Sequence, residues 1–223
     1  LGFRGFQWPA APAPAQPGNV TIDLSQAENV TVTLPEDATI IPKPTPKSDK
    51  LILVSAGHSN VPPRDPGAVG NGYTESIEAV RLRDAVADRL RLEGYTVIED
   101  GADGVNDPLR KAVVLAKRSD VAIELHWNAG TASATGIEVL SKPNKKRLAQ
   151  QLAGAIHRAT GIKIRGESGW KADNSGQHHR LAFCEAGGLI VEVCFISNRE
   201  DILRYKENFG SVADNIAEVL ENA

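Results

Sequence analysis

The chain has 223 residues, a formal net charge of −3 and 24% charged residues, which is an ordinary composition for a globular protein. The negative charge and the lack of a basic face argue against a nucleic-acid partner held through phosphate contacts. No apolar run approaches the about 20 residues that a membrane-spanning helix needs, so we expect no membrane span. The two cysteines, Cys184 and Cys194, are interpreted as buried thiols, with a disulfide between them as the alternative.

Residues 1–50 differ in composition from the rest of the chain. Residues 8–18 (WPAAPAPAQPG) predict an extended, semi-rigid tether. Residues 20–24 (VTIDL) and 30–34 (VTVTL) alternate apolar and polar side chains, which is the period of half-buried strands. Because such short strands bury too little surface to be stable alone, we expect this leader to anchor the chain to its main domain, to copies of itself or to a larger assembly. A disordered leader is the alternative.

From residue 51 onward, apolar strand patterns alternate with helical ones. Strands are expected at 51–55, 95–99, 121–125, 136–140, 181–183 and 189–195, and helices at 74–94, 107–119, 144–160 and within 198–221. Thr74 is a candidate N-cap, and Asp107 followed by Pro108 predicts the start of the second helix. The alternation predicts an α/β domain at 51–223 with a mainly parallel sheet, helices on both faces and a short Pro-rich, β-rich appendage at 1–50.

Four side chains at the ends of these elements are candidates for chemistry. His58 follows the first strand, Glu75 lies in the first turn of the next helix, and His126 ends the apolar stretch VAIELHWNAG. Open α/β sheets bind ligands at the carboxyl ends of their strands, although Glu75 could simply complement the helix dipole and His126 could be structural. Glu192 has no such alternative, because an unpaired charge inside an apolar strand costs several kcal/mol.

Together these residues match the chemistry of a catalytic metal site. Two imidazoles and one carboxylate are a common three-ligand set for zinc, which leaves a fourth position for water. The metal lowers the pKa of that water toward about 7, and a carboxylate that does not bind the metal, here Glu192, could accept its proton. The ligands do not form a compact motif such as H-E-x-x-H. The zinc site is therefore a hypothesis that requires the fold to bring these distant side chains together.

Several segments also resemble a known family. They are, in family order, GHSN (57–60), RDPGAVG (64–70), IELHWNA (123–129), GIEVL (136–140), IRG (164–166) and LIVEVCFISNRED (189–201). They are similar to zinc-dependent N-acetylmuramoyl-L-alanine amidases, the family of bacterial cell-wall amidases and many phage endolysins, over about residues 51–221. The resemblance implies that His58, Glu75 and His126 bind Zn²⁺ and that Glu192 is the catalytic general base. It also implies cleavage of the amide between N-acetylmuramic acid and the L-alanine of the stem peptide.

Three neighbouring residues are candidates for substrate binding. Trp127 stands where the family commonly has a small residue, and it could either stack on a sugar ring or pack in the core. Asn128 could contact the substrate or orient the ligands, and Arg165 could hold a substrate carboxylate. Cys194 alternates with Glu192, so we expect it on the same strand face, near the metal. Asp65 is interpreted as shaping its turn.

The predicted function is that of a peptidoglycan hydrolase acting at the bacterial cell wall, in the periplasm or outside the cell. We expect a phage lysin, carried on the virion or tail, whose leader at 1–50 binds phage structural proteins or self-associates. A bacterial exported amidase is the alternative setting. The alternative functions are a zinc peptidase acting within the stem peptide and a non-catalytic structural or binding protein of the phage particle.

Overall fold

The computed structural model describes residues 46–62, 64–101, 104–175 and 181–223, so the strands predicted within 1–50 lie outside the described residues. Its strands are β1 (Leu51–Ala56), β2 (Val69–Gly70), β3 (Tyr73–Thr74), β4 (Thr96–Glu99), β5 (Val121–Asn128), β6 (Glu138–Ser141), β7 (Trp170–Ala172) and β8 (Leu189–Phe195). Its helices are α1 (Glu75–Leu92), α2 (Leu109–Ala116), the 3-10 turn η1 (Pro143–Lys145), α3 (Lys146–Thr160), α4 (Ala182–Glu185), α5 (Arg199–Glu207) and α6 (Phe209–Glu221).

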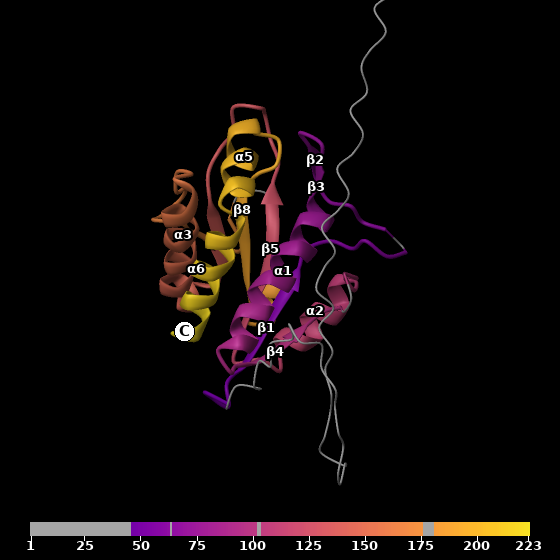
Figure 1. The fold of residues 1–223 in the computed structure, drawn as a ribbon, viewed down its shortest axis with the longest axis vertical. Coiled ribbons are helices and arrows are strands. Elements are labelled where there is room, and N and C mark those ends of the chain that lie inside the picture. Colours follow the sequence, from indigo (N-terminus) through magenta and orange to yellow (C-terminus); the bar gives the residue numbers. More distant parts are fainter. Residues whose placement is uncertain (1–45, 63, 102–103, 176–180) are drawn as a thin grey trace, which may run out of the picture. The chain divides into compact units, whose positions relative to one another are not determined.

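Six strands form one sheet in the order β4-β1-β5-β8-β6-β7 (Figure 1). Strands β4, β1, β5 and β8 are parallel, whereas β6 runs antiparallel to β8 and parallel to β7. After β1 the chain adds β4 on one side and then returns to add β5 on the other. The carboxyl ends of β1 and β5 therefore frame a topological switch point, which is where open α/β sheets bind ligands.

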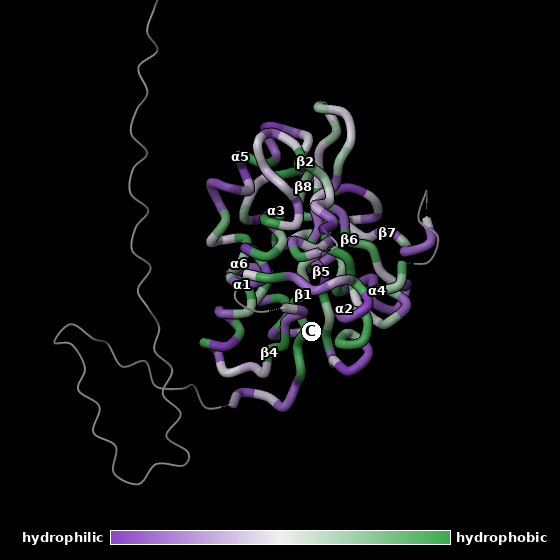
Figure 2. The backbone as a smooth tube through the Cα atoms, turned by 90° about the vertical axis from the view of Figure 1, so that its right-hand side faces the viewer, coloured by the Kyte–Doolittle hydropathy of each residue, from purple (hydrophilic) through white to green (hydrophobic). Residues whose placement is uncertain are grey.

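Helices cover both faces of the sheet, which confirms the predicted fold class (Figure 1). Helices α1, α3, α5 and α6 contribute to the larger core, and α2 and α4 contribute to the smaller one. In Figure 2, many of the loops at the edge of the domain are coloured as hydrophilic. None of the helices in the described ranges is both long and apolar enough to span a membrane.

The alternation along β5 decides which side chains reach which core. Ile123 and Leu125 belong to the larger core, and Ala122 belongs to the smaller one. Because successive side chains of a strand point to opposite faces, Glu124 and His126 share the face of Ala122. The strand therefore delivers two polar side chains to one face near its carboxyl end.

The helix boundaries differ slightly from those expected. Thr74 is the N-cap residue of α1, as predicted, although its side chain makes no capping hydrogen bond. Gly94, with φ of 87°, follows the helix and turns the chain toward β4. In α2 the N-cap residue is Pro108, so that this helix begins at Leu109 and Asp107 lies outside it.

The strand predicted at 181–183 is wrong, because this segment begins the short helix α4. A helical turn places Phe183 and Cys184, both fully buried, in the smaller core without needing a partner strand. Gly187, with φ of 96°, then turns the chain into β8. Both cysteines of the chain are buried free thiols, as expected.

Cys194 does not share the face of Glu192, and the prediction that it lies near the site is wrong. His126 pairs with Glu192, but Asn128 pairs with Phe195, so β8 contains one more residue than β5 between these pairs. Such a β-bulge breaks the alternation of side chains. Cys194 therefore enters the larger core, on the face opposite that of Glu192.

Candidate active site

Three predicted ligands come together at the switch point. One nitrogen or oxygen atom from each of His58, Glu75 and His126 lies within 4.8 Å of the others. Nε2 of His58 is 3.2 Å from Oε2 of Glu75, and Nδ1 of His126 is 3.0 Å from Oε1 of Glu75. The loop after β1, the first turn of α1 and the end of β5 each supply one of these side chains. The fold thus gathers a His-Glu-His cluster from three separate segments.

Two glycines leave the space that this cluster occupies. A Cβ atom on Gly57 would lie 2.4 to 2.6 Å from ring atoms of His126. At Gly67, where φ is +67°, a Cβ atom would lie 2.5 Å from Cδ2 of His58 and 2.6 Å from Oε2 of Glu75. A larger residue at either position would displace a member of the cluster, so the surrounding loops need glycine there.

Each histidine also contacts a second, outer carboxylate. Nδ1 of His58 is 3.0 Å from Oδ2 of Asp65, and Nε2 of His126 is 2.9 Å from Oε2 of Glu124. Burial lowers the pKa of His126, but Glu124 and Glu75 more than offset this effect and raise its pKa well above the usual value. Metal-binding histidines characteristically give their outer ring N–H to such a carboxylate, so this donor set fits a metal ion.

Glu75 stays ionised although it is buried. Its carboxylate accepts hydrogen bonds from the backbone N–H groups of Ala68 at 2.7 Å and Trp127 at 2.9 Å. Burial raises the pKa of Glu75, but its hydrogen bonds with His126 and His58 lower that pKa by more than burial raises it. The net shift of the pKa is therefore strongly downward. A negative charge is therefore fixed between the two imidazole rings.

Glu192 lies directly beside this cluster in the sheet. It is the register partner of His126 on β5 and of Glu138 on β6. The residue keeps some exposure, but its Oε2 atom is buried and has no hydrogen-bond partner among the described residues. Burial raises its pKa to about 7, although the charge of His126 opposes the shift. Such a carboxyl group can accept and donate a proton near neutral pH.

Asn128 and Arg165 converge on a neighbouring carboxylate. Nδ2 of Asn128 donates to Oε1 of Glu138 at 2.9 Å, and Nε of Arg165 donates to Oε2 of Glu138 at 3.0 Å. Since Glu138 is in register with Glu192, both residues lie close to the candidate general base. Their predicted contacts with the substrate remain predictions.

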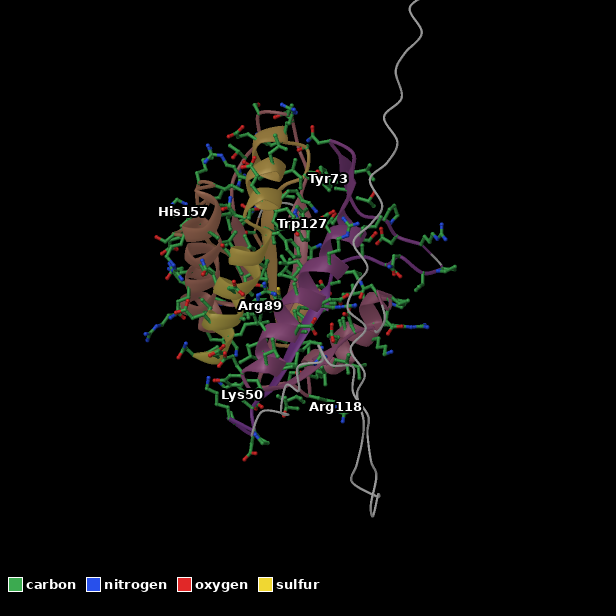
Figure 3. All side chains as sticks on the ribbon, viewed as in Figure 1. Lys50, Tyr73, Arg89, Arg118, Trp127 and His157 are labelled. Atoms are coloured by element: carbon green, nitrogen blue, oxygen red, sulfur yellow. The ribbon has the colours of Figure 1, made fainter. Side chains whose placement is uncertain are left out.

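The predicted contact of Trp127 with a sugar ring is wrong. The side chain, labelled in Figure 3, is 2% exposed. Its ring centroid lies 5.2 Å from that of Tyr205 in the larger core. The period of two along β5 explains this position, because Trp127 follows His126 and points to the opposite face. The other interpretation, packing in the core, holds.

Of the two outer carboxylate contacts, only that of Glu124 could have been predicted from the sequence. Glu124 lies two residues before His126, so the strand period alone predicts that both side chains share a face. Asp65 was interpreted only as shaping its turn, and its carboxylate does accept a hydrogen bond from the N–H of Gly67 at 3.3 Å. Its contact with His58 depends on how the loop closes, which no local pattern indicates.

Comparison with known proteins identifies the family. The sequence profile of the N-acetylmuramoyl-L-alanine amidases called Amidase_3 matches residues 52–222. The crystal structure of a candidate N-acetylmuramoyl-L-alanine amidase from Neisseria meningitidis is 46% identical, with a TM-score of 0.70, and the match covers 77% of this chain and 93% of that one. The catalytic domain of the CD27L endolysin, which targets Clostridia difficile, is 26% identical, with a TM-score of 0.59 and coverage of 78% and 97%.

The protein YqiI of Bacillus subtilis is 26% identical over 163 residues, which are 70% of this chain and 75% of YqiI. The family profile begins in the first strand of the sheet and ends beside the last helix. It therefore includes all but one residue of the sheet and every member of the cluster, and the chain belongs to the N-acetylmuramoyl-L-alanine amidase family.

Proposed function

We propose that this protein is a zinc-dependent peptidoglycan amidase that cleaves the bond between N-acetylmuramic acid and the L-alanine of the stem peptide. Membership of the family supports the amidase reaction on peptidoglycan. The observation that carries the metal dependence is the convergence of His58, Glu75 and His126 beside the unpartnered Glu192.

The donor set favours zinc over harder cations. Two imidazoles and one carboxylate suit Zn²⁺, whereas Mg²⁺ and Ca²⁺ prefer oxygen ligands. In this proposal His58, Glu75 and His126 hold the ion, and the outer carboxylates of Asp65 and Glu124 orient the two imidazole rings. When bound, zinc supplies an acidified water and polarises the carbonyl of the scissile amide.

Glu192 carries the proton in this reaction. It accepts a proton from the attacking water as the new carbon–oxygen bond forms, and it returns a proton to the nitrogen as the carbon–nitrogen bond breaks. The products are the free lactyl carboxylate of the sugar and the free amino group of L-alanine. A pKa of about 7 suits both steps, because the group is a competent base and a competent acid near neutral pH.

The test is digestion of purified sacculi with the wild type and with Glu192→Ala, each with and without a metal chelator. Glu218→Ala, on the exposed surface of α6, is the matched control. The wild type and the control should release stem peptides that begin with free L-alanine, whereas Glu192→Ala and the chelated enzymes should not. New ends within the stem peptide would indicate a zinc peptidase instead. Zinc stoichiometry near zero without any new ends would indicate a non-catalytic structural or binding protein.

We also propose that the enzyme acts at the bacterial cell wall as a phage lysin carried on the virion or tail. The likeness to the CD27L catalytic domain and the anchor predicted at residues 1–50 support this setting. The likeness to the Neisseria protein supports the alternative of a bacterial exported amidase. Deletion of 1–50 should preserve hydrolysis but abolish self-association or incorporation into a particle. Loss of hydrolysis in the truncated protein would count against an anchor.

A further inference from the structure

A fully buried arginine lies behind the candidate active site. Arg83 in α1 is 0% exposed. On one side its guanidinium contacts Asp84 at 2.7 Å and Glu99 at 3.3 Å. On the other side, Nη1 of Arg83 lies 3.4 Å from Oδ1 of Asp100 and 3.3 Å from Oδ1 of Asn106. Replacing a buried ion pair by apolar residues is often neutral or stabilising, so stability alone does not account for this arrangement.

One arm of the network leads from Arg83 to His126. The hydroxyl group of Ser55 lies between two carboxylates, 2.7 Å from Oδ2 of Asp100 and 3.4 Å from Oε1 of Glu124. The other oxygen of Glu124 contacts Nε2 of His126 at 2.9 Å. A continuous series of polar contacts therefore connects the buried guanidinium to the outer nitrogen of one predicted ligand.

A second arm leads from Arg83 to His58. The side chain of Asn106, which accepts from Arg83, donates through Nδ2 to the carbonyl oxygens of Ala56 at 2.5 Å and His58 at 2.6 Å. His58 has a φ of 65°, a conformation that residues other than glycine adopt only at a cost. The amide of Asn106 holds the backbone there. The third ligand, Glu75, begins the same helix that carries Arg83.

We propose that Arg83, Asp100, Ser55 and Asn106 form a positioning network that holds both histidine ligands in the geometry for metal binding. None of its members belongs to the cluster of His58, Glu75 and His126, and they act through Glu124 and through the backbone at His58. This inference rests on the proposed zinc site. Ligands that are already in place lose less freedom on binding, so the network strengthens metal affinity.

The test compares two buried serines. Ser55→Ala removes the contact between Asp100 and Glu124, whereas Ser141→Ala removes an equally buried hydroxyl group in β6 that contacts Trp170 and does not contact the cluster. The measurements are zinc affinity by competition with a chromophoric chelator, the visible spectrum of the Co²⁺-loaded protein, and the unfolding free energy of the metal-free protein. Asp100→Asn is a second variant that keeps the shape of the network.

We expect Ser55→Ala and Asp100→Asn to weaken zinc binding by about tenfold, the lower end of the effect of outer partners on metal affinity, and to change the Co²⁺ spectrum. Ser141→Ala should change neither. If both network variants bind zinc as the wild type does and lose only unfolding free energy, the network serves folding and the inference is overturned. If the wild type itself binds no stoichiometric zinc, the proposed function fails as well, and the two failures are thus distinguishable.

Discussion

Replacing Glu192 by glutamine should remove most of the activity and reduce the dependence of stability on pH. The substitution keeps the shape of the side chain but removes its proton chemistry. Loss of a general base of this kind costs about 10²- to 10⁴-fold in rate. The zinc stoichiometry should be unchanged, because Glu192 is not among the three clustered ligands.

The effect on stability follows from the pKa of Glu192, which burial raises from 4.5 to about 7. Because the folded-state pKa is the higher one, the folded protein binds the proton more tightly than the unfolded chain does. The resulting stabilisation is fully present below about pH 4.5 and is lost as the pH rises through about 7. At about 1.4 kcal/mol per pKa unit, the full loss amounts to about 3.5 kcal/mol.

The assay is chemical denaturation of the chelator-treated wild type and Glu192→Gln at about pH 5 and about pH 8. Comparing each protein with itself cancels the constant cost of burying the glutamine amide. The wild type should lose about 2.5 kcal/mol more unfolding free energy over this range than the variant does, because part of the effect is already lost at pH 5. Equal losses would refute the raised pKa, and a variant that still releases L-alanine ends would refute the role as general base.

Three further substitutions test other parts of the site. Gly57→Ala should displace the ring of His126 and lower both zinc affinity and hydrolysis, because the new Cβ atom would lie 2.4 to 2.6 Å from ring atoms. The control is Gly154→Ala in α3, where the new Cβ atom would meet only one atom, at 4.0 Å. This control should keep its zinc affinity and gain about 0.5–1 kcal/mol of unfolding free energy in denaturation. A loss of zinc affinity in both variants would contradict the argument. Asp65→Asn should weaken zinc binding about tenfold in chelator competition, since it loses the carboxylate on an imidazole, and unchanged affinity would remove its orienting role. Trp127→Ala should lower the unfolding free energy by about 3–5 kcal/mol, because the side chain is buried in the core, and should leave the KM for sacculi fragments unchanged. A raised KM would instead indicate that Trp127 contacts the sugar.

The sheet and the cluster were predictable because both depend on strong local patterns. Runs such as LILVS and VAIEL are apolar at all but one position, as expected for strands buried on both faces, and helical periods separate them. The rule that ligands bind at carboxyl ends then drew attention to His58 and His126. Glu192 stood out because a lone carboxylate in an apolar strand needs an explanation.

The wrong predictions concern places where one extra residue breaks the alternation of a strand, or where contacts between distant segments determine the local structure. A single extra residue in β8 moved Cys194 to the opposite face, and no local signal in the sequence marks that bulge. The segment at 181–183 is short and apolar, which fits a strand and a buried helical turn equally well. The burial of Arg83 could not be foreseen, since its acidic partners Glu99 and Asp100 come from the end of β4 and from the residue that follows it.

The cluster is assembled from distant parts of the chain, so the protein must fold before it can bind a metal ion. Glu75 and His126 are separated by 51 positions, and their approach requires that β1, α1 and β5 are already packed together. An unfolded chain would have to close this long loop before any ion could bridge the two residues. A metal ion should therefore slow unfolding and raise the melting temperature with its concentration, yet leave the rate of folding unchanged.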